Sequence, residues 1–196
     1  MRVIGLTGGI AAGKSTVSRL LAQNGALIVD ADEIAKSLSA KGNAAYCAIL
    51  DLFGPDYLLS DGELDRKKIA GRVFSSKRDL DALNRATHPL VYQEVQAVLA
   101  RTQAQFVVID APLLFEAGLD ALCEEVWVVV CDDAQRIERI CRRDGCDRKT
   151  AEARIAAQQS QQALVKRAAV ILENCGDRQA LEKRVAEVLY EKKITR

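Results

Sequence analysis

The chain has 196 residues, of which 49% are hydrophobic and 28% charged, and its formal net charge is +1. These values are typical of a globular protein with one domain, or one domain carrying an insertion. The near-neutral charge gives no sign of a nucleic acid or membrane partner. The six cysteines include no C-x-x-C pair and have no metal-like spacing with the single histidine. We therefore expect a reduced, cytoplasmic protein, and a monomer.

The most informative motif occupies residues 8–15 and reads Gly8-Gly9-Ile10-Ala11-Ala12-Gly13-Lys14-Ser15. It has the G-x-x-x-x-G-K-S pattern of a phosphate-binding loop, or P-loop. An apolar strand at 3–7 precedes it, and a helix beginning at Ser15-Thr16 follows. Backbone N–H groups at a helix N-terminus bind phosphate, and glycines let the backbone approach closely. Lys14 is expected near the β and γ phosphates, and the Ser15 hydroxyl on Mg²⁺.

The rest of the chain alternates between strand-like and helix-like segments, as in α/β proteins with a parallel sheet. The predicted strands are 3–7, 26–29, 106–109, 126–131 and 170–172. In the last long strand, Cys131 is expected to pack as a small hydrophobic residue.

Residues 31–104 interrupt this alternation, because they contain amphipathic segments and no convincing strand. The predicted helices are 31–39, 43–53, 65–74 and 77–101. We interpret the region as a helical insertion that binds a second substrate, between two parts of a nucleotide-binding core at 1–30 and 105–196. The alternative is a long crossover without a function of its own.

The segment Asp30-Ala31-Asp32-Glu33 follows the second predicted strand. In the structural interpretation, Asp30 caps the next helix and Glu33 completes an approximate capping box. In the functional one, groups beyond the carboxyl ends of strands face the ligand crevice of an α/β sheet. Both can hold together, with Asp30 as the cap and Asp32 accepting the proton of an attacking hydroxyl.

Asp110 directly follows the apolar run 106–109. Together with the P-loop, it fits the second nucleotide motif, whose acid supports Mg²⁺ or its water shell. The following residues lack the glycine of a GTPase switch, and no Asn-Lys-x-Asp guanine-binding motif occurs in the sequence. A GTP-dependent switch is therefore disfavoured.

Arg136, Arg139 and Arg143 are spaced three and four residues apart, so they share one face of a predicted helix. One interpretation is a charged solvent face, and the other is a lid whose arginines stabilise a migrating phosphoryl group. The glutamine-rich helical stretch 147–169 is open to the same two interpretations. For His88, which precedes a proline, a hydrogen-bonded structural role competes with substrate contact.

Taken together, these motifs resemble those of the dephospho-coenzyme A kinase family, and the similarity runs nearly end to end. The P-loop is shared with many proteins, but Asp-Ala-Asp at 30–32 and Pro-Leu-Leu-Phe-Glu at 112–116 are more specific. The other segments that carry the resemblance are Gly5–Ile10, Phe53-Gly54, Asp61–Arg66, Leu83-Asn84, Thr87–Pro89, Arg139 with Arg143 and Asp144, Arg154 with Gln158, and Asn174 with Gly176.

The resemblance implies a three-layer α/β P-loop kinase core with a five-stranded parallel sheet. It also implies a helical domain that receives dephospho-CoA and a lid over ATP at about residues 139–165. The implied reaction transfers the γ-phosphoryl group of ATP, with Mg²⁺, to the ribose 3′-hydroxyl of dephospho-CoA. The products are coenzyme A and ADP, in the final step of coenzyme A synthesis.

The same resemblance assigns roles to individual residues. The catalytic residues it implies are Asp32 as the base, Lys14, Arg139 and Arg143. The nucleotide contacts are Gly8, Gly9, Ile10, Ala11, Ala12, Gly13, Lys14, Ser15, Thr16 and Asn174, with Ser15 on the metal. The acceptor contacts are Thr7, Asp32, Lys36, His88, Asp110 and Leu113.

Four positions depart from the family pattern. Ala11-Ala12 replaces the usual Gly-Ser at variable positions of the loop. Lys36 replaces the usual arginine, which weakens an expected phosphate contact. Ala169 replaces an aspartate that is usual before the last strand, so any role of that acid is in doubt here.

Two rival functions remain open at this point. One is another small-molecule kinase, such as a nucleoside monophosphate kinase, against which the helical insertion and the Asp-Ala-Asp segment argue. The other is a non-catalytic P-loop binding module or switch, against which Lys14, Ser15, Asp32 and Asp110 argue.

Overall fold

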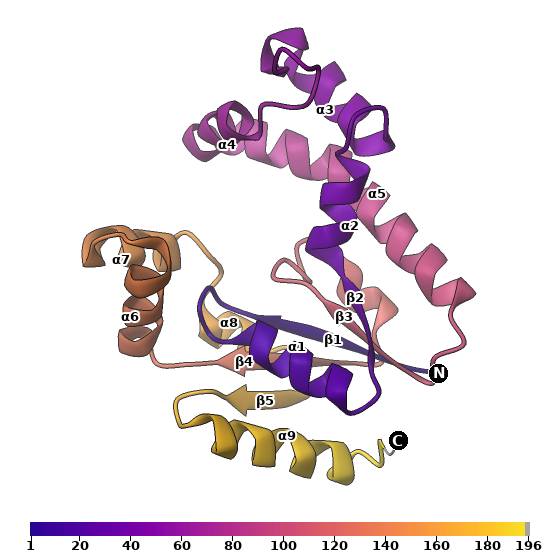
Figure 1. The fold of residues 1–196 in the computed structure, drawn as a ribbon, viewed down its shortest axis with the longest axis vertical. Helices are drawn as coiled ribbons and strands as arrows, with labels where there is room; N and C mark the ends of the chain where they lie inside the picture. Colours follow the sequence, from indigo (N-terminus) through magenta and orange to yellow (C-terminus); the bar gives the residue numbers. More distant parts are fainter. Residues whose placement is uncertain (195–196) are drawn as a thin grey trace. The chain divides into compact units, whose positions relative to one another are not determined.

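Five strands form one sheet in the order β2-β3-β1-β4-β5 (Figure 1). The strands are β1 (Arg2–Gly8), β2 (Leu27–Asp30), β3 (Phe106–Asp110), β4 (Glu125–Val130) and β5 (Val170–Glu173). β1 pairs in parallel with both β3 and β4, and β4 pairs in parallel with β5. Each predicted strand is confirmed to within two residues at its ends, and so is the α/β fold class.

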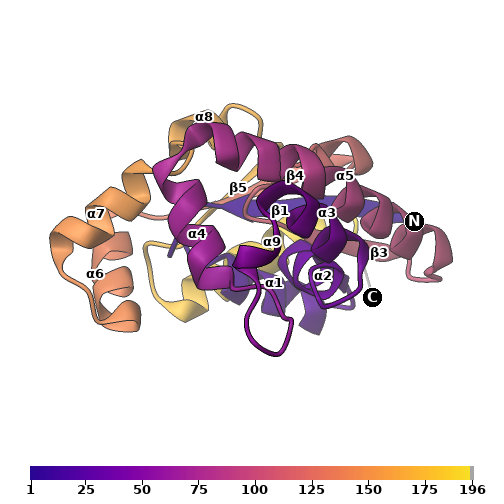
Figure 2. The same ribbon diagram turned by 90° about the horizontal axis from the view of Figure 1, so that it is seen from above.

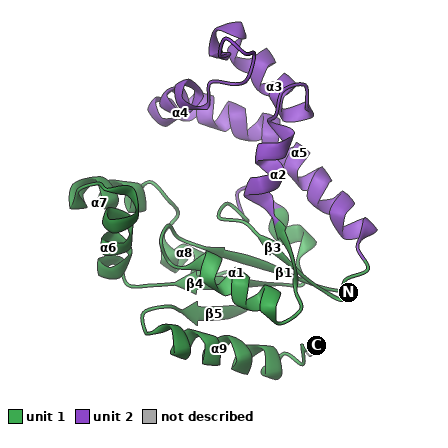
Figure 3. Cartoon of the chain, viewed as in Figure 1, with its two compact units in different colours: residues 1–29, 103–114, 119–196 green, residues 30–102, 115–118 purple. Residues whose placement is uncertain are grey.

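The computed structural model describes residues 1–194, which divide into two compact units (Figure 3). Unit 1 contains residues 1–29, 103–114 and the chain from 119 onward, and unit 2 contains 30–102 and 115–118. The expected boundaries at 30 and 105 differ from this division chiefly in that residues 115–118 belong to unit 2. No helix within residues 1–194 is long and apolar enough to cross a membrane.

The main core of unit 1 lies on one face of the sheet, beneath α1 (Lys14–Gln23) and α9 (Arg178–Glu191). Alternate residues of β1, including Ile4 and Leu6, point into this core because successive strand side chains face opposite ways. Trp127 on β4 is fully buried there, and Cys131 packs in the same core, as predicted. The six cysteines are all free thiols.

Three further helices of unit 1 are α6 (Asp133–Asp144), α7 (Arg148–Ala156) and α8 (Gln161–Val165). α6 and α7 pack against each other as a helical hairpin (Figures 1 and 2), with Gly145 in the left-handed conformation ending α6. The stretch 147–169, predicted to be helical, contains two helices, α7 and α8, and is not helical between them or after Val165. It breaks between α7 and α8, where Ser160 caps α8 by accepting a hydrogen bond from the Ala163 N–H.

Unit 2 is helical, with α5 (Lys77–Arg101) contacting α2 (Ala31–Leu38), α3 (Ala44–Phe53) and α4 (Arg66–Ser75). The four helices match the four predicted from the amphipathic pattern. Their small core joins Tyr46, Ile49, Leu64, Ile69 and Val73. Two 3₁₀ turns complete the described chain, at Pro55–Tyr57 and Leu119–Leu122.

The close packing of β1 on β4 leaves no space at Gly8. A Cβ atom built there would lie 2.6 Å from the backbone oxygen of Val129, and a backbone atom cannot move aside as a flexible side chain can. By contrast, a Cβ at Gly71, inside α4, would meet nothing within 4 Å.

We predict that Gly8→Ala lowers the free energy of unfolding by roughly 1–3 kcal/mol through overpacking. Gly71→Ala is the matched control and is expected to raise it by up to about 1 kcal/mol, because alanine favours a helix interior. Urea unfolding followed by circular dichroism measures both. Equal stabilities of Gly8→Ala and the wild type would show that β1 and β4 separate without cost.

Candidate functional site

The P-loop connects the end of β1 to the start of α1. Gly13 precedes the helix in the left-handed conformation, with φ of 99°, and as the N-cap residue it has no side chain that could cap the helix start. The first backbone N–H groups of α1 therefore have no side-chain acceptor there, which suits them to an anionic ligand. Ser15 lies exposed in this first turn, and Thr16 donates its backbone N–H to the Gly13 carbonyl.

Lys14 and Asp110 are brought together, since the Lys14 ammonium donates a hydrogen bond to the Asp110 carboxylate. Asp110 is 5% exposed at the carboxyl end of β3, where it pairs in register with Leu6 of β1. Thr7 is fully buried and donates its hydroxyl to the Pro112 carbonyl at 3.1 Å. These contacts fix the carboxyl ends of two adjacent strands around the start of the P-loop.

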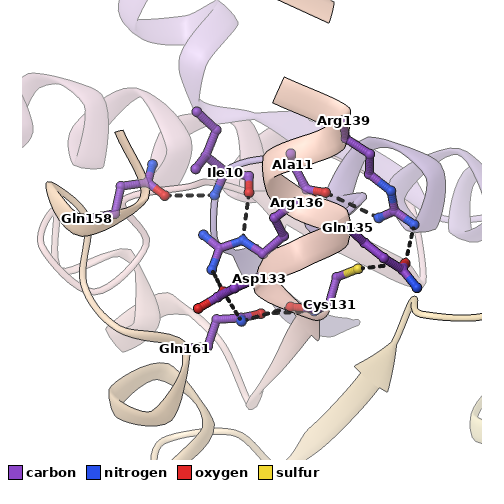
Figure 4. Close-up of polar contacts among 9 residues, drawn as sticks. All are labelled: Ile10, Ala11, Cys131, Asp133, Gln135, Arg136, Arg139, Gln158 and Gln161. Atoms are coloured by element: carbon purple, nitrogen blue, oxygen red, sulfur yellow. Dashed lines mark hydrogen bonds and ion pairs between the residues drawn. The ribbon is translucent and has the colours of Figure 1, made fainter. Parts of the chain in front are cut away.

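Two arginines of α6 hold the P-loop from the outside (Figure 4). Arg136 Nε donates to the carbonyl of Ile10 at 2.9 Å, and Arg139 Nη1 donates to the carbonyl of Ala11 at 3.2 Å. Arg136 is only 3% exposed. The solvent-face interpretation is therefore wrong for Arg136, because its guanidinium is buried against the loop.

Two side chains from other segments hold the neighbouring peptides. Gln158 Oε1 accepts the backbone N–H of Ile10 at 2.7 Å (Figure 4). Asn174 Nδ2 donates to the carbonyl of Ala12 at 2.8 Å, and the Asn174 carbonyl accepts from Arg139 Nη2 at 2.9 Å. We call Arg136, Arg139, Gln158 and Asn174 the P-loop clamp.

The glycines of the loop make room for this clamp. A Cβ at Gly9 would lie 2.6 Å from Arg136 Nη2, and a Cβ at Gly13 would lie 1.9 Å from Asn174 Nδ2. Their lack of a side chain thus admits protein groups from outside, in addition to the expected approach of phosphate from within.

A second row of contacts supports the clamp from behind (Figure 4). Asp133 accepts from Arg136 Nη1 at 2.8 Å. Gln135 Oε1 accepts from Arg139 Nη2 at 3.3 Å. The Gln161 side-chain amide exchanges two hydrogen bonds with the backbone of Cys131, each of 2.9 Å. These glutamines therefore anchor the start of α6 and the end of β4, so that for Gln161 a purely solvated role is wrong.

Arg143 lies one turn beyond Arg139 and is exposed. Its Nε and Nη2 donate to the two carboxylate oxygens of Asp144 at 2.6 and 3.0 Å, and Arg154 donates to the same carboxylate. The hydrogen bond and the charge of Arg143, followed by the charge of Arg154, hold the pKa of Asp144 below its ordinary value, and the hydrogen bond with Asp144 raises the pKa of Arg143. Asp144 therefore stays ionised at neutral pH and ties two arginines together at the α6–α7 turn.

In unit 2, Asp30 is the N-cap of α2, as predicted. Its carboxylate accepts the backbone N–H groups of Asp32 at 2.9 Å and Glu33 at 3.1 Å. Asp32 lies exposed in the first turn of α2. One turn further, the exposed Lys36 ammonium lies 3.5 Å from the Glu33 carboxylate, and the Lys36 carbonyl lies 3.5 Å from Arg66 Nη2.

The remaining two predicted acceptor contacts lie in different units. In unit 2, His88 Nδ1 is 3.1 Å from the carbonyl of Glu116, so this ring has a structural hydrogen-bond partner. It also lines an open pocket of about 520 Å³ together with Asn84, Arg85 and Glu116. In unit 1, the Leu113 side chain is 47% exposed and so remains accessible from solvent.

Unit 2 also contains a cavity of about 290 Å³ with a mainly apolar lining. Its walls include the buried Ile49, Ile69 and Val73, and the 84% exposed ring of Phe74 lies at its edge. Segments that carry the family resemblance contribute further lining residues: Leu64, Arg66, Leu83, Asn84 and Thr87. Motifs that are separated in the sequence thus surround one cavity.

Three features of this site were not predicted from the sequence: the burial of Arg136, the apolar cavity, and the glutamines that bind backbone groups. The spacing of Asp133 and Arg136 was the available signal for the first, because residues three apart on a helix can form an ion pair. No local pattern indicates that Gln158 will bind the P-loop, because 148 positions separate it from Ile10 in the sequence.

Comparisons with known proteins identify the family of the chain. A model of the dephospho-CoA kinase family matches residues 2–180. A dephospho-CoA kinase of Carboxydothermus hydrogenoformans is 40% identical over 190 residues, covering 95% of this chain and 92% of that protein. Among solved structures, one from Thermus thermophilus has a TM-score of 0.83 and 34% identity, covering 97% of each chain.

The dephospho-CoA kinase of Campylobacter jejuni is a further structural relative, with a TM-score of 0.69 and 27% identity over 98% of each chain. The family model and the relative at 40% identity both extend over nearly the whole chain, across the P-loop, the helical segments of unit 2 and the clamp residues. The chain therefore belongs to the dephospho-CoA kinase family, a family of phosphotransferases that act in the final step of coenzyme A synthesis.

Proposed function

We propose that unit 1 holds ATP and unit 2 holds dephospho-CoA, and that the γ-phosphoryl group passes to the ribose 3′-hydroxyl of the acceptor. The observation that carries the division of roles is the separation of two kinds of site. The uncapped start of α1, Lys14 and the clamped P-loop lie in unit 1. The apolar cavity with its polar rim lies in unit 2.

The residues at the P-loop fit a Mg²⁺–nucleotide complex. Ser15 offers a hydroxyl and Asp110 a carboxylate, and Mg²⁺ prefers such oxygen donors alongside phosphate oxygens and water. When bound, Mg²⁺ neutralises part of the charge that the phosphates carry. Lys14 supplies a cation of the protein's own, and the backbone N–H groups of the loop complete the anion site.

Acceptor binding is supported by the cavity and by two cations of unit 2, Arg66 and Lys36. The apolar lining suits the carbon-rich part of dephospho-CoA, and the polar groups at the rim suit its amide and ribose groups. Arg66 lines the cavity and also contacts the Lys36 backbone. We propose that these two cations bind an anionic group of the acceptor. Arg66 would then compensate for the weaker binding of an anion by lysine, compared with arginine, at position 36.

Asp32 is proposed to accept the proton of the attacking hydroxyl. It follows the carboxyl end of β2 by two residues, and the cap at Asp30 fixes the first turn of α2 that carries it. The arginines of α6 are proposed to stabilise the migrating phosphoryl group. Arg143 is better suited than Arg139 to direct contact, since Arg143 is exposed and pairs only with a neighbouring side chain among the described residues, whereas Arg139 donates to two backbone carbonyls and a glutamine.

An acceptor panel tests the proposed function. We expect ADP release in the presence of dephospho-CoA, with kcat/KM far above that for AMP or other nucleoside monophosphates. Comparable kcat/KM for AMP would support a nucleoside monophosphate kinase, and ATP binding without turnover of any acceptor would support a non-catalytic module. We expect the protein to act in the cytoplasm and to be a monomer. Light scattering measures the oligomeric state.

We predict that Asp32→Asn loses turnover while binding both substrates almost normally, because it keeps the shape of the side chain and removes the proton acceptor. Loss of a general base typically costs about 10²–10⁴-fold in rate. Steady-state kinetics and calorimetric binding of each substrate separate the two effects. More than about a tenth of the wild-type kcat would reduce Asp32 to a positioning role.

Arg66→Ala is predicted to raise the KM for dephospho-CoA by about 10-fold, which is typical for loss of a charged hydrogen bond. The KM for ATP should not change, because Arg66 belongs to unit 2. Lys67→Ala removes the neighbouring exposed cation and is the control. If both variants have the same KM for dephospho-CoA, Arg66 does not contact the acceptor.

A further inference from the structure

Arg136 differs from the other arginines of α6 in what it contacts. Its guanidinium is almost completely buried between the P-loop and Asp133. Nε donates to the Ile10 carbonyl, while Nη1 donates to Asp133 on the other side. Two of the three guanidinium nitrogens, Nε and Nη1, thus donate hydrogen bonds within the protein. A buried charge with two fixed partners is costly to disturb, so its position defines that of the loop.

The geometry of the peptide unit makes this contact relevant to phosphate binding. Because the peptide is planar and trans, the N–H of Ala11 points opposite to the carbonyl of Ile10. Holding that carbonyl outward therefore holds the next N–H inward, toward the concave side where a P-loop binds anions. Asn174 acts in the same way on the carbonyl of Ala12 and hence on the N–H of Gly13.

We propose that Arg136 is a positioning residue for phosphate binding, which acts by orienting the Ile10–Ala11 peptide and makes no contact with the nucleotide itself. Its charge alone does not suffice. The donor to Ile10 is Nε, the atom that a methylene group replaces in lysine. A lysine therefore keeps the positive charge but sets an apolar group against the carbonyl.

The test uses inorganic pyrophosphate and ADP as probes, with dissociation constants from calorimetry. Arg136→Met and Arg136→Lys are both expected to weaken pyrophosphate and ADP by a similar factor of about 10. The factor should be similar for the two probes because the loop binds phosphates, and pyrophosphate contains two phosphates without the adenosine of ADP. The KM for ATP should rise by the same factor, with a smaller change in kcat, since the loop binds ground state and transition state alike. Arg142→Met, an exposed position on the same helix, is the control and should match the wild type.

A structural role alone would lower the melting temperature and leave pyrophosphate affinity unchanged in the folded protein, and that result would overturn the proposal. Wild-type affinity in Arg136→Lys would also overturn it, because charge would then be sufficient. If Arg136→Met does not fold, Asp133→Ala decides, since it removes the outer partner of the guanidinium and leaves the buried side chain in place. A loss of about 2–5-fold in pyrophosphate affinity is expected for that variant, and no loss would refute the proposal.

The inference rests on the proposed phosphate-binding role of residues 8–15, and the same experiment separates the two. A wild-type chain that binds neither pyrophosphate nor ADP would refute that role. Binding by the wild type that is unaltered in the folded variants would refute only the positioning by Arg136.

Discussion

The orientation of a few peptide units in the P-loop is the constraint on which the rest of unit 1 depends. A phosphate site built from N–H groups requires that the carbonyls of the same peptides face outward, where they need donors of their own. Arg136, Arg139 and Asn174 supply those donors to three successive carbonyls. The helix after β4 and the segment after β5 thus fix the peptides of the P-loop without belonging to the loop themselves.

The sheet order explains why these donors can reach the loop. β1 is central, β4 is its neighbour and β5 follows at the edge. The chain after β4 and the chain after β5 therefore emerge on the same side of the P-loop, at the carboxyl ends of parallel strands. Gly9 and Gly13 let the clamp side chains approach the loop, since a Cβ at either position would collide with one of them.

The sequence predicted most of the fold and the P-loop, because these depend on local patterns. Strands at 106–109 and 126–131 are continuous apolar runs, and the helices of unit 2 follow from amphipathic spacing. The cap at Asp30 was equally local. Arg136 could not be predicted to be buried, because an arginine among charged neighbours looks the same whether it faces solvent or a backbone carbonyl distant in the sequence. The break between α7 and α8 was missed because glutamines and alanines favour helix, whereas Gln158 and Gln161 are committed to distant backbone groups.

The uneven anchoring of α6 has a mechanical consequence. Arg136 and Arg139 join its first half to the P-loop, whereas Arg143 near its far end is hydrogen-bonded to Asp144, the last residue of the same helix. If the α6–α7 hairpin moves as ATP enters and ADP leaves, the hinge lies within α6, beyond Arg139, and the α6–α7 turn moves farthest. Such a movement displaces Arg143 but keeps the hydrogen bonds that Arg136 and Arg139 make to the P-loop. Nucleotide exchange then does not require the loop to form again for the next turnover.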